Sequence, residues 1–127
     1  MAMNEMQKTR FEQGRAALNE VKALRESGMD IQFVLSQLYQ AYYYPVIALV
    51  YDGKVPETMQ SVTIGLFQQR FVDSGIIGKE HGDAVRRIFE LKPKCSGGCL
   101  LVTPDEIDSL VEKAGAFLAA VETFLSR

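Results

Sequence analysis

Apolar residues recur every three or four positions along most of this chain, the spacing of one face of an α-helix. The longest such stripe begins at position 104 and is unbroken; it comprises Ile107, Leu110, Val111, Ala114, Phe117, Leu118, Val121, Phe124 and Leu125. Thr103 can cap this helix, Pro104 suits its first position, and Glu106 completes a Thr-x-x-Glu capping box. The pattern therefore predicts a helix from 104 onward.

Four helical segments are predicted before it, at about 4–27, 30–51, 57–74 and 79–92. The first is amphipathic through Phe11, Leu18, Val21 and Leu24, and Gly28 ends it. Asp30 is the expected cap of the second segment, Asp52-Gly53 its closing turn, and Gly75 the end of the third. The third is expected to bury Val62, Leu66, Phe67 and Phe71, and the fourth Val85, Ile88, Phe89 and Leu91.

The second segment is the densest in apolar residues and is predicted to be a central, largely buried helix. Its shared face comprises Val34, Leu35, Leu38, Tyr42, Val46 and Leu49. Pro45 lies inside this pattern. Since proline removes a backbone donor and clashes with the preceding turn, we expect a kink near Ala41–Tyr44.

The remaining stretches predict loops. GIIGKEHGD is expected to be irregular or a single short turn, and Pro93 with Gly97-Gly98 is expected to break any helix. CLLV alternates as a strand would, but it is too short to build a sheet. The sequence therefore predicts an all-α protein, an up-and-down bundle of four to five antiparallel helices, with residues 1–127 forming one domain.

Composition excludes several classes of protein. The chain has 127 residues, of which 47% are hydrophobic and 24% charged, and its net charge is −2. This is typical of a soluble globular domain, without the basic field that attracts nucleic acid or anionic membranes. No apolar run is long enough to span a bilayer, so no membrane partner is expected. The polar start MAMNEMQKTRFEQGR lacks an apolar signal region, and we expect a cytoplasmic protein.

Both cysteines lie in the sequence CSGGC, at Cys95 and Cys99. A structural zinc site needs four ligands, and the one histidine of the chain is His81. A redox pair would need the shorter CxxC spacing. We expect two reduced loop residues, with no metal and no cofactor; a metal shared by two subunits, each giving both thiolates, is the alternative.

Basic residues gather in and after the fourth predicted helix, at Arg86, Arg87, Lys92 and Lys94. They can contact phosphates at a helix C-terminus, or they can simply solvate the outer face of the bundle. His81, in the charged sequence KEHGDAVRR, is expected to be an exposed surface residue with no nucleophile beside it.

Three consecutive tyrosines, Tyr42, Tyr43 and Tyr44, cannot share one helix face, because neighbours diverge by about 100°. At least one must leave the core face. There it can contact a partner subunit, which we favour, or stack on a base.

The order of these features resembles the central part of small HEPN-domain proteins. The resemblance rests on Ala41-Tyr42-Tyr43, on Ile64, Leu66, Phe67, Phe71 and Val72, on Gly75, on Lys79-Glu80-His81-Gly82, and on Arg86, Arg87, Phe89 and Leu91, and it extends over about residues 10–126. It implies a helical bundle that pairs as a homodimer, often beside a minimal nucleotidyltransferase in toxin–antitoxin or related pairs. Active members are metal-independent RNases that use an Arg-x(4–6)-His motif, or a related arginine followed by acidic and tyrosine residues.

This chain departs from the motif. Lys92 occupies the position of the arginine, and no His, Asp or Tyr follows in PKCSG; the Thr-His of relatives is replaced by Thr58-Met59. Lysine lacks the bidentate fork of arginine. We therefore expect a non-catalytic homodimeric module that binds a protein partner of nucleotidyltransferase type, or a nucleotide or RNA. Its groove would be lined by Tyr43, Tyr44, Arg87, Lys92 and Lys94. The alternative is a metal-independent RNase of toxin–antitoxin type that uses Lys92, Arg86 or Arg87, and His81.

Overall fold

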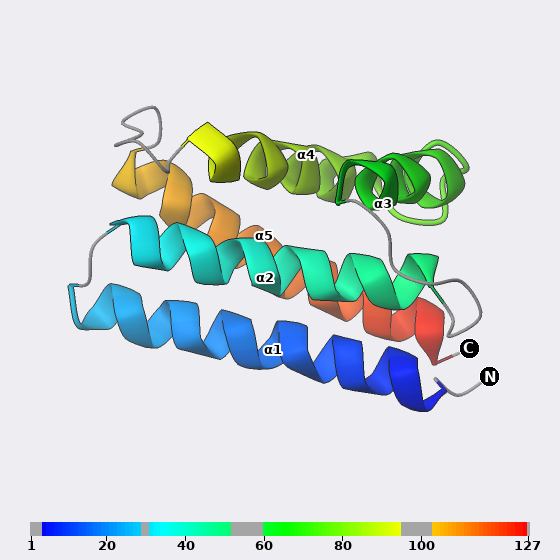
Figure 1. Ribbon diagram of the computed structural model, residues 1–127, viewed down its shortest axis with the longest axis horizontal. Helices are drawn as coiled ribbons and strands as arrows, with labels where there is room; N and C mark the ends of the chain where they lie inside the picture. Colours follow the sequence, from blue (N-terminus) through cyan, green and yellow to red (C-terminus); the bar gives the residue numbers. More distant parts are fainter. Residues whose placement is uncertain (1–3, 29–30, 52–59, 95–102, 127) are drawn as a thin grey trace.

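The computed structural model describes residues 4–28, 31–51, 60–94 and 103–126, and every regular element in these ranges is helical. In chain order these are α1 (Glu5–Glu26), α2 (Ile31–Val50), α3 (Gln60–Phe67), the π-helix η1 (Gln68–Val72), α4 (Lys79–Lys94) and α5 (Pro104–Leu125). Consecutive long helices run in opposite directions, and the start of α1 and the end of α5 lie at the same end of the bundle (Figure 1). The predicted all-α bundle is confirmed.

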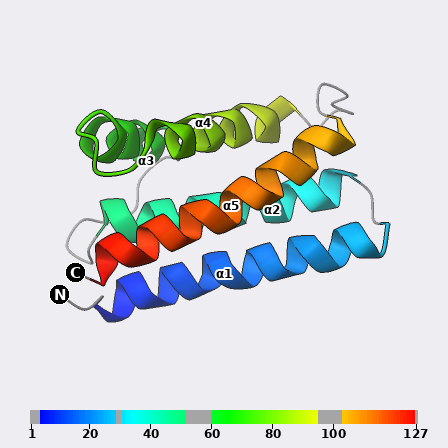
Figure 2. The same ribbon diagram turned by 180° about the vertical axis from the view of Figure 1, so that it is seen from behind.

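Helix α2 is the centre of the bundle, as its apolar density predicts. It packs against α1, α3, α4 and α5. The α2–α5 pair lies between α1 on one side and α4 on the other, an arrangement visible from both sides (Figures 1 and 2). The largest fully buried side chains join these layers; they include Phe11, Tyr42, Tyr51, Phe67 and Phe117.

Helix ends follow local chemistry. Asn4 caps α1 in a capping box with Gln7, and Thr103 Oγ1 accepts the backbone N–H of Glu106 at 3.1 Å. Gly28 and Gly75 follow helices with φ of 74° and 83°, in the left-handed region that glycine adopts without strain. The predicted cap Asp30 and turn Asp52-Gly53 lie outside the described residues.

Two predicted helices need correction. The third ends in a π-helix, and Val62, expected on its apolar face, is 47% exposed. The fourth does not stop before Pro93 but continues through it to Lys94. A proline in the last turn costs one backbone hydrogen bond with little helix left to disrupt, so it does not end the helix there. Gly97-Gly98 and CLLV lie outside the described residues.

A close contact joins α1 to α2 at the proline. Pro45 lies inside α2, and the helix continues past it to Val50. Gly14 of α1 is buried against it: a Cβ on Gly14 would lie 2.7 Å from Pro45 Cδ and 3.4 Å from the Ala41 carbonyl oxygen. In a regular helix the backbone N–H of residue 45 would donate to the Ala41 carbonyl, but proline has no N–H. The kink predicted near Ala41–Tyr44 stays a prediction.

None of the described helices is both long and apolar enough to cross a bilayer.

Candidate functional site

The basic residues that the sequence singles out all belong to α4. Arg86 is exposed and Arg87 is half-buried, whereas Lys92 and Lys94 lie in the last turn, where their side chains are outside the described part of the structure. Cys95 and Cys99 also lie outside the described residues. In the part of the chain that the structure describes, no three His, Cys, Asp or Glu side chains gather as a metal-binding group.

Arg87 is engaged by the next helix. Its Nε donates to Glu106 Oε2 at 2.7 Å, and its second guanidinium nitrogen donates to Glu106 Oε1 at 3.0 Å. This two-bond geometry matches the planar guanidinium to the carboxylate and ties α4 to the first turn of α5. The hydrogen bond from Arg87 lowers the pKa of Glu106, against a smaller opposing effect of burial. A phosphate that uses Arg87 must therefore compete with a carboxylate already in place.

His81 is not the exposed residue that its charged neighbours predict. Its side chain is 13% exposed, and its ring packs at a tilt on Phe117 of α5, with the centroids 5.7 Å apart. Its Nε2 lies 3.7 Å from Glu80 Oε1. Its charged neighbours Lys79, Glu80 and Asp83 are exposed, whereas the ring at position 81 packs on α5. The prediction that His81 is exposed was therefore wrong, because the charge of neighbouring residues in the sequence does not determine which side of the helix position 81 faces.

The candidate catalytic residues are spread over α4. At 100° per residue, Arg86 and Arg87 lie about 140° and 120° around the helix from His81. Lys92 returns to the same side but lies about 16 Å further along the axis, since each residue adds about 1.5 Å. Within one chain, α4 therefore does not bring His81 and a basic side chain to a common point. A phosphoryl transfer needs charge stabiliser and proton carrier at one reacting group.

The three tyrosines diverge as predicted. Tyr42 is buried, its hydroxyl donates to the Leu110 carbonyl oxygen at 2.6 Å, and burial raises its pKa. Tyr43 is half-buried and stacks on Tyr39 at 5.3 Å between centroids. Tyr44 is half-buried on another side, where the Arg10 guanidinium lies 5.9 Å from its ring centroid. Tyr44 thus faces α1, while Arg87 faces α5, so the two predicted ligand contacts lie on different sides of the bundle.

A groove of about 280 Å³ lies between α1 and α2, which sequence analysis missed. It is lined by Gln13, Ala16 and Ala17 of α1 and by Gln37, Gln40 and Tyr44 of α2. Uncharged amides and an aromatic ring form its walls. The signal in the sequence was the spacing of Gln37, Gln40 and Tyr44, which places them on one face of α2 away from the core face.

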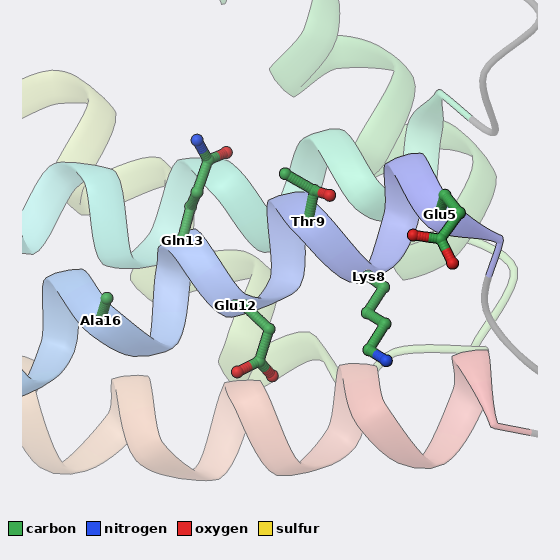
Figure 3. Close-up of a pocket in the computed structure, with 6 residues that line it drawn as sticks. All are labelled: Glu5, Lys8, Thr9, Glu12, Gln13 and Ala16. Atoms are coloured by element: carbon green, nitrogen blue, oxygen red, sulfur yellow. The ribbon is translucent and has the colours of Figure 1, made fainter.

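A second hollow, of about 470 Å³, lies on the outer surface of α1 alone (Figure 3). Its lining residues are Glu5, Lys8, Thr9, Glu12, Gln13 and Ala16. Figure 3 shows Gln13 and Thr9 pointing to the α2 side and Lys8 and Glu12 to the α5 side. The two glutamates flank the one lysine at helical spacing, so the charges offset one another and the hollow offers no site for an anion.

Comparison with known proteins gives one informative match. The chain is 27% identical over 112 residues to a UPF0332 protein of Thermotoga maritima, covering 87% of this chain and 84% of that protein. The match spans nearly the whole bundle rather than one motif. No protein-family profile and no solved structure matches the chain.

Proposed function

We propose that this chain is a non-catalytic helical binding module of HEPN-like type, which acts as a homodimer. Its ligand is a nucleotide or RNA, or a protein partner of the nucleotidyltransferase type that the resemblance implies. The observation that carries the proposal is that two of the candidate catalytic side chains already contact helix α5. Arg87 is closed in a two-bond pair with Glu106, and His81 packs on Phe117.

The basic residues of α4 support the nucleotide or RNA ligand. Arg86 is exposed beside the engaged Arg87, and Lys92 and Lys94 follow six and eight residues after Arg86, at the end of the helix. Lysine and arginine side chains along one helix can position a phosphate backbone without any chemistry on it. The overall charge of −2 means that such binding must come from this local cluster.

An RNase assay tests the absence of catalysis. Purified protein with EDTA is incubated with structured and single-stranded RNAs, and we expect no cleavage above a buffer control. The competing RNase reading predicts cleavage that disappears in both His81→Ala and Lys92→Ala. That result would overturn the proposal.

Fluorescence anisotropy of a labelled single-stranded RNA and of a labelled nucleotide tests the ligand. Arg86→Ala and Arg87→Ala are a matched pair, since each removes one positive charge at neighbouring positions. We expect Arg86→Ala to weaken binding and to reduce its salt dependence by about one counterion. Arg87→Ala should act mainly on stability, because it removes the partner of Glu106. Equal effects of both on binding would contradict the assigned role of the Arg87–Glu106 pair.

A further inference from the structure

The outward face of α2 carries no charge. The whole helix, IQFVLSQLYQAYYYPVIALV, contains no Asp, Glu, Lys, Arg or His. Part of it nevertheless faces solvent: Phe33 is 60% exposed, Ser36 is exposed, and Gln37, Gln40 and Tyr44 are half-buried. A solvent-facing helix surface that has aromatic residues and contributes no charge of its own is typical of the core of a protein–protein interface.

Four of these residues form a continuous stripe, which we call the α2 stripe: Phe33, Gln37, Gln40 and Tyr44. Their spacings of four, three and four are those of a coiled-coil seam. At 100° per residue they fall within about 60° of the helix circumference, over about 16 Å of its length. The stripe is therefore straight enough for a second helix to pack along it.

The order of residue types in the α2 stripe is symmetric, aromatic–amide–amide–aromatic. If a second copy of α2 packs antiparallel, with a twofold axis between residues 38 and 39, Phe33 lies opposite the partner's Tyr44. Gln37 then lies opposite the partner's Gln40, and each contact occurs twice. A twofold interface requires this kind of self-complementary surface. Two amides can exchange donor and acceptor, and two aromatic rings can stack.

The groove between α1 and α2 adds shape to this surface. Gln37, Gln40 and Tyr44 line it on one side and Gln13 and Ala16 on the other. Ala16 is small, which leaves the hollow open beside the stripe. Tyr44 marks the end of the groove that would receive Phe33 of a second copy, and the Arg10 guanidinium lies 5.9 Å from the centroid of its ring. An exposed aromatic residue entering a formed hollow is the usual anchor of an interface.

We propose that the α2 stripe is the twofold contact between two copies of this chain, with Phe33 seated at the Tyr44 end of the partner's α1–α2 groove. The proposal rests on the homodimer in the proposed function and names the surface that forms it.

Two double variants test the pairing, because they change the same positions and differ only in the sign of one charge. In Gln37→Glu/Gln40→Glu, every new carboxylate faces a carboxylate of the second copy. In Gln37→Glu/Gln40→Lys, every new charge faces its opposite. By sedimentation equilibrium, the first should raise the dimer Kd by at least about a hundredfold, since like charges in an interface cost several kcal/mol. The second should stay within about tenfold of the natural chain.

A single variant and a matched control complete the test. Phe33→Glu should dissociate the dimer, whereas Ile76→Glu, at a side chain that is 45% exposed in the turn before α4, should not. Thermal unfolding followed by circular dichroism identifies any variant that fails to fold. A natural chain that is monomeric at submillimolar concentration overturns the proposal together with the homodimer of the proposed function, whereas the absence of catalysis and the ligand are still decided by the RNase and anisotropy assays. So does a dimer that both double variants leave intact, and that outcome leaves the non-catalytic function standing because the interface then lies elsewhere. Cleavage of RNA in the RNase assay would overturn the proposed non-catalytic function, but it would not contradict the proposed α2 interface.

Discussion

The contact between Gly14 and Pro45 gives the sharpest test of how α1 and α2 pack. In Gly14→Ala the new Cβ would lie 2.7 Å from Pro45 Cδ and 2.8 Å from Pro45 Cγ. Ordinary carbon contacts begin near 3.5 Å, so something must move. The proline ring is rigid and fixed to the backbone of α2, and it cannot rotate away. The helices themselves must separate, at the centre of the largest helix–helix contact in the bundle.

The magnitude follows from two opposing effects. Alanine in a helix interior is about 1 kcal/mol better than glycine, which favours the variant. Overpacking a close contact costs about 1–3 kcal/mol, which opposes it. Gly115→Ala separates the two effects, because Gly115 lies inside α5 with no atom within 4 Å of its would-be Cβ. Both exchanges gain the same propensity, so their difference in unfolding free energy is the steric cost alone, about 1–3 kcal/mol.

Urea unfolding followed by circular dichroism measures this difference, and thermal unfolding should show it as a gap of about 4 °C per kcal/mol for a domain of this size. Equal stabilisation by the two alanines would refute the close approach of α1 to Pro45. The background Pro45→Ala removes Cγ and Cδ, so there Gly14→Ala should cost less than in the natural chain. A double-mutant cycle without such coupling would show that the proline ring is not the obstacle.

The other predictions concern single hydrogen bonds. Tyr42→Phe should lower the unfolding free energy by about 1 kcal/mol, because it removes a buried bond to the Leu110 carbonyl; urea unfolding checks this, and an unchanged midpoint would contradict it. Glu106→Gln should change stability by less than about 1 kcal/mol at neutral pH, since the pair is about one-third exposed. The pKa of Glu106 is lowered in the folded chain, so the natural pair stabilises above the unfolded pKa of glutamate and loses that effect as pH falls through the folded pKa. Acid titrations of stability should therefore be flatter in Glu106→Gln; parallel curves would contradict the link to Arg87. Thr103→Ala should cost about 1 kcal/mol by removing the cap of α5, and Thr103→Ser should restore most of it; equal losses in both would argue against the cap.

Most of the fold follows from the sequence because its helices are long and strongly periodic. The stripe from Ile107 to Leu125 and the buried face of α2 are where the spacing places them. The predictions are wrong where a residue that usually ends a helix lies at a position where continuing the helix costs little free energy. Pro93 was expected to end α4, yet a proline in the last turn removes only one bond, and the helix reaches Lys94.

The candidate site was less predictable, because the availability of a side chain is decided by residues on another helix. Arg86 and Arg87 are adjacent and chemically identical, and nothing local separates them. Arg87 is taken up by Glu106, which lies nineteen residues further along and becomes its neighbour only when α5 folds back on α4. His81 likewise meets Phe117 only in the folded bundle. A motif that fixes the order of residues along α4 therefore cannot say which of them a ligand can reach. The structure separates the two arginines, because it places Arg86 at the surface and pairs Arg87 with the Glu106 carboxylate.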